Sequence, residues 1–238
     1  MHKVEYYSAS SLGTYDTCPY RWWLNYVKKL KQLDNPAFII GTAYHKSLEL
    51  FYGGMSKEQV LEELKQQFIG SKEGIDQLGI VRQCFNKHQE YPIDLPVVSL
   101  EYKFDFVDPV TGLRFLGYID RLAENAVIEY KTSAFDYKDK DINEIQVVLY
   151  ALAFLFRVGR LPDVVYLSVM NKKKAKKDNY VPQMIPVKVG QEHIDRFYLK
   201  ATSIADKIEQ EKFDATPGVH CYYCPFGKKG TNNCKFSR

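Results

Sequence analysis

The stretch GYIDRLAENAVIEYKTS, residues 117–133, contains three side chains whose types could hold a divalent metal ion and activate a water molecule: Asp120, Glu129 and Lys131. Glu129 and Lys131 lie in VIEYKTS, which otherwise has the composition of a buried strand. Because successive side chains of a strand point to opposite faces, these two are predicted to share one face. Asp120 belongs to the preceding predicted strand, and we expect it to lie opposite them across a hairpin.

Such a convergence has a definite chemistry. Two carboxylates, together with water and a backbone carbonyl, form a hard oxygen site suited to Mg²⁺ or Mn²⁺. A bound metal ion acidifies an attacking water and stabilises the charge that builds on a phosphate. A lysine beside it can hold or deprotonate that water, since partial desolvation is expected to lower its pKa. Taken alone, the triplet is equally compatible with a buried ion pair or with a solvated strand face.

The cysteines suggest a second site. They are Cys18, Cys84, Cys221, Cys224 and Cys234. An odd number in a chain of this size argues against a disulfide framework. The closing segment CYYCPFGKKGTNNC has few core-forming residues and needs something other than hydrophobic burial to hold it. The spacing of Cys221 and Cys224 suits zinc or an iron–sulfur cluster, His220 and His193 are possible zinc ligands, and unligated thiols remain an alternative. Cys84, on a predicted helix, is expected to be a small core residue.

A basic loop is the third feature. Five lysines lie between positions 171 and 179: Lys172, Lys173, Lys174, Lys176 and Lys177. Charge runs are usually solvated surface. Beside a site that cuts phosphodiesters, these lysines are predicted to grip the nucleic-acid backbone without reading its sequence.

Composition sets the frame for these sites. The chain has 238 residues, 45% hydrophobic and 26% charged, with a net charge of +4. This balance is typical of one globular domain, with or without an appendage, and permits a nucleic-acid partner without demanding one. No apolar run approaches eighteen residues, so no membrane span is expected. The opening MHKVEYYSASS lacks an apolar signal core, which favours a cytoplasmic location.

Helices are predicted on both sides of a central group of strands. The predicted helices cover residues 8–30 in two parts, 38–54, 56–70, 75–90, 142–159 and 191–213, with Ser8 or Ser10 as the first cap and Pro19 in a first turn. The predicted strands cover residues 97–108, 113–124, 126–133, 164–170 and 180–189. The fold class is therefore α/β (α+β).

Several separate stretches together resemble one family. SASSLGTYDTCPYRWWLNYVKKL, GTAYHKSLE, GYIDRL, VIEYKTS, QVVLY and the closing cysteines, with Cys18 far upstream, follow one another from Ser8 to Cys234. This ordered set resembles the PD-(D/E)XK nuclease superfamily, specifically its RecB/AddB-like branch in the iron–sulfur form. That form includes the AddB subunit of bacterial recombination complexes and the CRISPR-associated nuclease of the RecB type. The resemblance implies a central mixed sheet of the PD-(D/E)XK type.

The resemblance also implies a metal site. It makes His45, Asp120, Glu129 and the backbone carbonyl of Tyr130 the ligands of Mn²⁺ or Mg²⁺, with the imidazole favouring Mn²⁺. Alone, His45 would be an ordinary core or surface histidine.

Three further residues gain a role from the same resemblance. Gln146 and Tyr150 lie at i and i+4 on one helix face, where the family places residues that position the DNA or the lysine. Without the family match they would be ordinary amphipathic residues. Glu101 is an exposed strand carboxylate on its own, and a supporting acidic residue in the family.

For the cysteines, the resemblance implies one [4Fe–4S] cluster held by Cys18, Cys221, Cys224 and Cys234, with Zn²⁺ as the alternative. It further implies a single nuclease domain over residues 1–238. Its core is expected at about 95–200, its helical N-terminal part at about 8–92, and its metal-cluster subregion at about 8–30 and 213–238.

The predicted function is a metal-dependent DNA exonuclease acting on single-stranded ends, in recombination, repair or CRISPR adaptation. A flap or structure-dependent endonuclease would use the same chemistry. A non-cleaving DNA-binding or assembly subunit is the alternative from another class, and RNA is not excluded as substrate. Because the chain has no helicase segment, unwinding would come from a helicase or from recombination or CRISPR adaptation partners.

Overall fold

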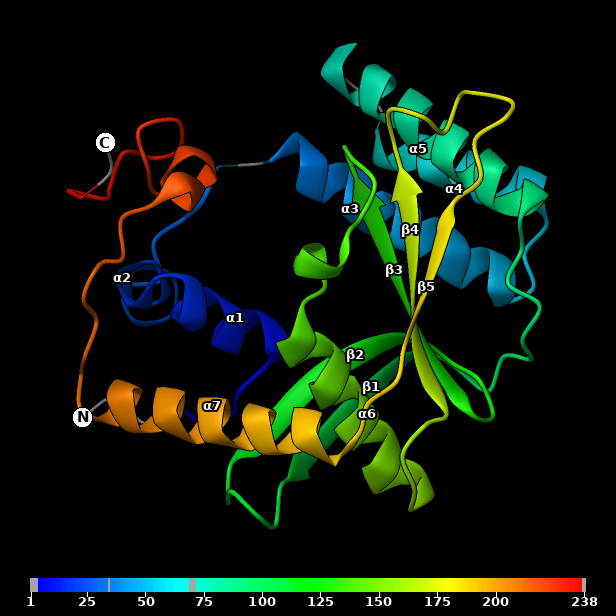
Figure 1. The fold of residues 1–238 in the computed structure, drawn as a ribbon. Helices are drawn as coiled ribbons and strands as arrows, with labels where there is room; N and C mark the ends of the chain where they lie inside the picture. Colours follow the sequence, from blue (N-terminus) through cyan, green and yellow to red (C-terminus); the bar gives the residue numbers. More distant parts are fainter. Residues whose placement is uncertain (1–3, 34, 69–71, 237–238) are drawn as a thin grey trace.

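A five-stranded mixed sheet forms the centre of the molecule (Figure 1). The computed structural model describes residues 4–33, 35–68 and 72–236. The strands are β1 (Ser99–Val107), β2 (Arg114–Leu122), β3 (Ala126–Ser133), β4 (Val164–Asn171) and β5 (Gln183–Val187), in the order β1-β2-β3-β4-β5. Only β3 and β4 run parallel, and the other neighbours are antiparallel. The predicted α/β class and central mixed sheet are confirmed.

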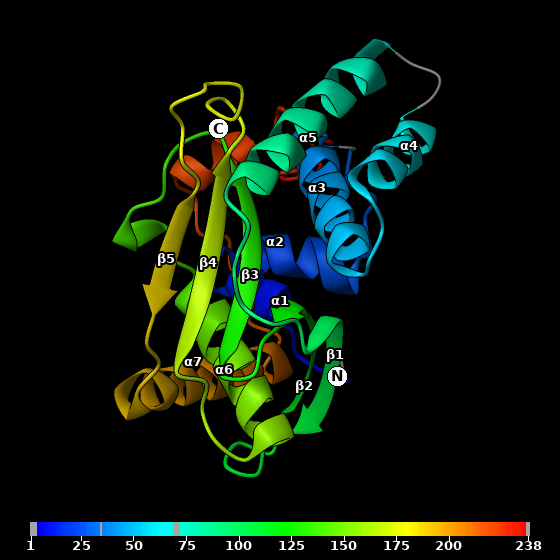
Figure 2. The ribbon, with the colours of Figure 1, turned by 90° about the vertical axis from the view of Figure 1, so that its right-hand side faces the viewer.

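Helices cover both faces of this sheet (Figure 2). They are α1 (Ala9–Thr17), α2 (Pro19–Trp22), the π-helical turn η1 (Trp23–Val27), α3 (Pro36–Tyr52), α4 (Lys57–Gln67), α5 (Lys72–Glu90), η2 (Asp139–Asp141), α6 (Glu144–Val158), α7 (Gln191–Glu209) and η3 (Val219–Tyr223). One hydrophobic core lies between α1, α6 and α7 and one face of the sheet, and a second lies between α3, α4 and α5 and the other face. The sheet is therefore the middle layer of three.

Local sequence signals explain where these helices begin. Ser8 caps α1 by accepting a hydrogen bond from the amide of Ser11, as predicted, and Pro19 occupies the first turn of α2. Asn35 and Asn143 cap α3 and α6 in the same way. Side-chain oxygens at these positions satisfy amides that the first helical turn leaves without partners. The predicted helix 56–70 ends at Gln67 in the structure, and positions 69–70 lie outside the described residues.

Strands β2 and β3 separate soon after their hairpin. Their register pairs only Arg121 with Ile128 and Leu122 with Val127. Farther along, the free edge of β2 is used by Tyr7, whose amide donates to the carbonyl of Arg114 and whose carbonyl accepts from the amide of Leu116. The two strands thus form a fork that opens beyond Arg121, toward Asp120.

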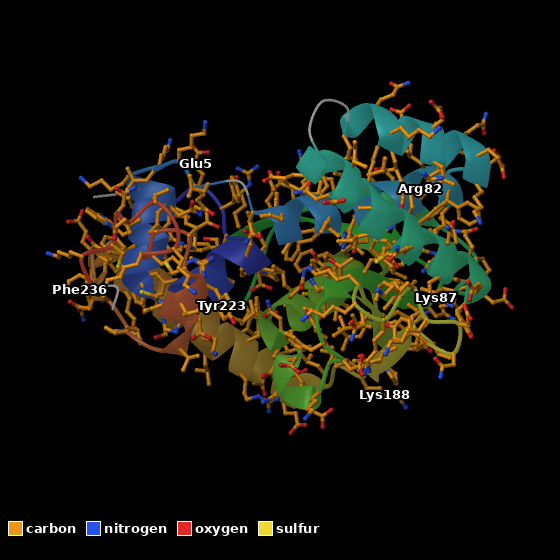
Figure 3. The ribbon with its side chains drawn as sticks, turned by 90° about the horizontal axis from the view of Figure 1, so that it is seen from above. Glu5, Arg82, Lys87, Lys188, Tyr223 and Phe236 are labelled. Atoms are coloured by element: carbon orange, nitrogen blue, oxygen red, sulfur yellow. The ribbon has the colours of Figure 1, made fainter. Side chains whose placement is uncertain are left out.

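The two ends of the described chain pack against each other. The ring of Trp22 stacks on Phe213 with centroids 5.6 Å apart, and the Tyr15 hydroxyl donates to the carbonyl of Lys212. After Phe213 the chain passes α2 to reach η3 (Figure 1), at the end of the molecule where Figure 3 labels Tyr223 and Phe236. There Phe226 is fully buried against Leu24. Phe226 therefore gives the tail one hydrophobic anchor, while Val219, Tyr222 and Tyr223 remain exposed.

None of the helices among the described residues is both long and apolar enough to cross a membrane.

Candidate active site

Asp120 lies at the fork between β2 and β3. Its Oδ2 accepts a hydrogen bond of 2.7 Å from the amide of Tyr130, which has no backbone partner on β2 at this point. Its Oδ1 lies 3.0 Å from Nδ1 of His45, which α3 presents from the opposite side. The predicted position of Asp120 across the hairpin from Glu129 and Lys131 is confirmed, and the fork gives its carboxylate room to reach both partners.

Glu129 and Lys131 share one face of β3, as predicted. Lys131 Nζ donates to Glu129 Oε1 at 2.6 Å and to Gln146 Oε1 at 2.8 Å. The Nε2 group of Gln146 donates to Glu129 Oε1 at 2.9 Å and to the Tyr150 hydroxyl at 3.0 Å. Helix α6 therefore fixes the carboxylate and the ammonium of β3 through one amide side chain.

Burial and charge shift the pKa values of these groups in different directions. Burial, then the nearby Asp120 carboxylate, raise the pKa of Glu129 to about 8. Burial acts to raise the pKa of Asp120, but the charge and hydrogen bond of His45 and the amide of Tyr130 outweigh it and lower that pKa. Burial acts to lower the pKa of His45, and the Asp120 carboxylate outweighs it, so the pKa of His45 is raised.

The pKa of Lys131 differs from the expectation. Burial acts to lower it, but the charge and hydrogen bond of Glu129 outweigh burial and leave the pKa of Lys131 raised. The lowered pKa expected from partial desolvation was wrong for this arrangement, because the sequence does not show how close the carboxylate lies. The raised pKa favours the ammonium form of Lys131, which donates to both Glu129 and Gln146.

The donor set at the fork suits a divalent metal ion. Glu129 Oε2 is buried and has no hydrogen-bond partner among the described residues. A buried carboxylate oxygen without a partner costs free energy, and a cation would satisfy it. Within the described ranges, no three His, Cys, Asp or Glu side chains are already arranged as a metal site. The fit therefore rests on the two carboxylates, with His45 hydrogen-bonded to one of them.

Glu101 lies opposite Asp120 where the β1–β2 register is interrupted. Leu100 pairs with Arg121 and Tyr102 with Ile119, but no pair is formed at Glu101. Its φ is +45°, a left-handed conformation that is unusual for a residue with a long side chain. Burial, then the charge of Asp120, raise the pKa of Glu101 to about 6. The interruption turns an ordinary strand carboxylate toward the site.

A pocket of about 520 Å³ opens over these groups. Its lining includes His45, Asp120, Lys131 and Glu101, together with Glu49 one helical turn beyond His45 on α3. Glu49 was not among the predicted site residues. Its spacing of four residues from His45 was the available signal, because i and i+4 share a helix face.

A buried polar cluster supports β3 from the side opposite Lys131. His88 Nε2 lies 2.8 Å from the Tyr52 hydroxyl, and His88 Nδ1 lies 3.4 Å from that of Tyr44. Arg121 stacks over the Tyr52 ring at 4.1 Å and reaches the Tyr130 hydroxyl at 3.5 Å. This cluster was not predicted either, because its members come from α3, α5, β2 and β3 and share no spacing in the sequence.

The four cysteines of the predicted cluster line one small hollow. Cys18 comes from the start of α2, while Cys221, Cys224 and Cys234 come from the tail. His220 lines the same hollow, and its Nε2 is buried with no hydrogen-bond partner in the described part of the chain.

Two related predictions have different outcomes. His193 lies in the first turn of α7, where its Nδ1 accepts the amide of Gly190. It is not among the residues that line the hollow, so its prediction as a zinc ligand was wrong. Cys84 is fully buried on α5, as expected of a core residue.

The basic loop follows β4 at the same sheet edge where β3 ends. The amide of Lys172 donates to the carbonyl of Ser133. Lys174 is ion-paired with Asp136 on the loop after β3, whereas Lys173, Lys176 and Lys177 are exposed. The lysines thus lie beyond the site along β3, and one of them is committed to holding the two loops together.

Comparison with known proteins agrees with this architecture. A family model described as the PD-(D/E)XK nuclease superfamily matches residues 6–228, and the chain belongs to that superfamily. Its nucleases generally use Mg²⁺ or Mn²⁺. No curated protein matches the chain.

Two solved structures are similar to the chain. A candidate exonuclease from Eubacterium rectale superposes with a TM-score of 0.63 and 13% identity, over 98% of this chain and 90% of that one. At this identity the match shows a shared fold. The protein SSO0001 gives a TM-score of 0.46 and 14% identity, over 99% of this chain and 88% of that one.

Proposed function

We propose that this protein is a metal-dependent DNA exonuclease of the RecB/AddB-like branch that acts on single-stranded ends. The observation that carries the proposal is the joint placement of Glu129 and Lys131 by Gln146, with Glu129 Oε2 buried and without a partner in the described residues. In a purely structural ion pair, both oxygens of a buried carboxylate are expected to have hydrogen-bond partners, and Glu129 Oε2 has none in the described residues. Superfamily membership and the shared fold support the same reading.

The metal ion, Mn²⁺ or Mg²⁺, would be held by Asp120, Glu129, the backbone carbonyl of Tyr130 and His45. When bound, it would acidify an attacking water and stabilise negative charge on the phosphate. His45 Nδ1 is hydrogen-bonded to Asp120, so the imidazole either joins the ligands or orients that carboxylate. Glu129 is kept in place through Oε1, which leaves Oε2 for the cation.

The other side chains would hold the reactants. Lys131 supplies an ammonium that can donate to the attacking water or to a phosphate oxygen, and Gln146 and Tyr150 fix its direction. A fixed donor aimed at developing charge is worth far more in a water-poor site than in bulk solvent. Glu101, opposite Asp120, supports the metal side of the pocket.

The basic loop would carry the strand away from the pocket. Lys173, Lys176 and Lys177 are exposed, half-buried Lys172 adds charge, and Lys174 keeps the loop against β3 through Asp136. Contacts to phosphates of this kind give affinity without sequence preference and weaken steeply with salt.

The cysteine hollow would hold a [4Fe–4S] cluster through Cys18, Cys221, Cys224 and Cys234, with Zn²⁺ as the alternative. All four line one hollow although Cys18 lies some two hundred residues from the others. A ligand there would tie the two ends of the chain and close a very long loop, which stabilises the fold by restricting the unfolded chain. We divide the single domain accordingly into a core at about 95–200, a helical part at about 8–92, and a cluster subregion at about 8–30 and 213–238, of which residues 237–238 are not described.

The pathway would be recombination, repair or CRISPR adaptation, with a helicase or an adaptation protein supplying the single strand. DNA of matched sequence in three forms tests the activity: linear single strands labelled at the 5′ or 3′ end, closed single-stranded circles, and flapped duplexes. An exonuclease degrades the linear strands with Mn²⁺ or Mg²⁺ and leaves the circles intact. Cleaved circles or single cuts at the flap junction would favour the endonuclease. Binding without cleavage of any form, RNA included, would favour an assembly subunit.

The cluster is tested by anaerobic purification. A [4Fe–4S] protein would be brown, with four iron atoms per chain, and Cys18→Ala or Cys221→Ala would bleach it and lower its stability. Cys84→Ala is the matched control, because that thiol is in the core and away from the hollow. Colourless protein with stoichiometric zinc would show a zinc site in place of the cluster. If neither iron nor zinc is found, the hollow has no metal-binding role.

A further inference from the structure

Phe38 exposes a phenyl ring at the edge of the active-site pocket. It lies in the first turns of α3 and is 73% exposed, among the highest exposures of any large apolar side chain in the described residues. The same side chain lines the pocket that contains His45, Asp120 and Lys131. A ring held in water costs free energy that a ligand can recover by covering it.

The position of this ring is fixed by the helix that carries it. Asn35 caps α3 and Pro36 begins it, so the backbone of the first turn is well defined. One turn after Phe38, Gly41 lies against β3, where a Cβ would be in van der Waals contact with Thr132 Oγ1 at 3.4 Å. Thr132 is the neighbour of Lys131 on β3. Because Gly41 lies against Thr132, the first turns of α3, which carry Phe38, lie close in space to the candidate catalytic lysine. Figure 1 shows this approach of α3 to the end of β3.

The chemistry around the ring is complementary to a nucleotide. The pocket lining includes the Asp120 carboxylate and the Lys131 ammonium, which suit a phosphate with its metal ion. The first turn of α3 adds Phe38 and Ala37 to the lining, and both are apolar. A nucleotide has the same two parts, a charged phosphate and a flat base with a π-face.

We propose that Phe38 is a specificity-determining residue that stacks on an unpaired base next to the phosphate being cleaved. This inference rests on the proposed nuclease function and assigns a residue to its preference for single strands. Every base offers a π-face, so stacking of this kind tolerates any sequence. A base inside a duplex is already stacked and paired, and it reaches the ring only by leaving its neighbours, at a cost of a few kcal/mol. Phe38 therefore favours single strands and frayed ends over intact duplex ends.

The test compares ring and non-ring side chains on one substrate. Phe38→Ala should weaken binding of a short single strand by roughly five- to a hundredfold, as expected from the loss of one base-stacking contact. Phe38→Trp should restore binding, whereas Phe38→Leu, which keeps apolar bulk but has no π-face, should not. Binding is measured by fluorescence anisotropy in Ca²⁺, and cleavage of the same strand is followed in Mn²⁺.

Two further readouts separate stacking from a structural role. With 2-aminopurine beside the scissile position, wild-type protein should quench its fluorescence and Phe38→Ala should not. On a strand with an abasic site at that position, the two proteins should bind equally. Leu199→Ala is the control, because Leu199 is also 73% exposed but lies on α7, outside the pocket.

The outcomes distinguish this inference from the proposed function. Cleavage by the wild type with unchanged binding and quenching in Phe38→Ala would overturn the role of Phe38 and leave the nuclease assignment intact. A shift of Phe38→Ala to a smaller species on size-exclusion chromatography, with DNA binding unchanged, would instead make the ring part of a contact between copies of this chain. Absence of cleavage by the wild type on every strand would contradict the nuclease function itself.

Discussion

The carboxylate of Asp120 accepts a hydrogen bond of 2.7 Å from the amide of Tyr130, and this bond closes the fork between β2 and β3. It replaces a backbone pair that the sheet does not make there. The same carboxylate is the candidate metal ligand. Asp120 therefore has two roles, as the acceptor that stabilises the fold and as a candidate metal ligand, and substitutions can separate the two.

Asp120→Asn and Asp120→Ala are expected to differ in stability but not in activity. The asparagine keeps an oxygen for the Tyr130 amide, whereas alanine leaves that amide unpaired and should cost about 1–3 kcal/mol more in the free energy of unfolding. Both variants lack the carboxylate and should lose metal-dependent cleavage. Urea denaturation and end-labelled digestion measure the two effects, and equal stability of the variants would remove the structural role.

Gln146 is expected to act by positioning Lys131 and Glu129. Gln146→Glu preserves shape but places a carboxylate against Glu129 Oε1, so metal affinity or activity should fall by about 10–100-fold. Tyr150→Phe is the milder comparison, because it removes only one hydrogen bond to the Gln146 amide. Metal titration and kcat should both move for Gln146→Glu. An unchanged metal titration would return Gln146 to an ordinary helix residue.

Glu101 is expected to lower the stability of the fold through its backbone conformation while its carboxylate supports activity. Its left-handed conformation is strained for a glutamate, and asparagine adopts that region more readily. Glu101→Asn should leave the free energy of unfolding unchanged or raise it by up to about 1 kcal/mol, while cleavage falls. Glu101→Gln removes the negative charge but keeps the strained backbone, so it separates the effect of the charge on cleavage from the effect of the backbone on stability. A variant that loses stability with full cleavage would contradict this role.

The buried His88 predicts a dependence of stability on pH. Burial, then the Arg121 guanidinium, lower the pKa of His88 to about 4. The other groups that face it are the Tyr44 and Tyr130 hydroxyls, whose pKa values burial raises, and the Tyr52 hydroxyl, 2.8 Å from Nε2. An unfolded chain binds a proton at His88 below about pH 6.5, and the folded protein does not until about pH 4. Stability contributed by neutral His88 is therefore present above the unfolded pKa and is lost as pH falls.

Between pH 7 and pH 5 this loss should reach about 2 kcal/mol in the free energy of unfolding. His88→Gln removes the titration, so its stability should change less over the same interval, even if its stability at pH 7 is lower. Urea denaturation at both pH values gives the comparison. Parallel changes in the two proteins would show that His88 does not titrate in this way.

Much of this arrangement follows from the sequence. Alternation and helical periodicity predicted the strands and helices, because one face of each is buried. The strand rule placed Glu129 and Lys131 together, and the family resemblance brought His45 and Gln146 to them. The fork was not predictable, since no spacing shows where β2–β3 pairing stops or that Tyr7 pairs with β2 farther along. The raised pKa of Lys131 and the anchoring by Phe226 depend on distances that no spacing encodes.

The most direct test of the central claim is single-turnover digestion of an end-labelled single strand by wild type and by Lys131→Ala. Circular dichroism and metal titration first establish that the variant is folded and binds Mn²⁺. The account predicts progressive loss of nucleotides from the wild-type reaction, only with Mn²⁺ or Mg²⁺, and a rate lower by about 10²–10⁴-fold for Lys131→Ala. Equal rates for the two proteins, or wild-type cleavage that persists in a chelator, would contradict it.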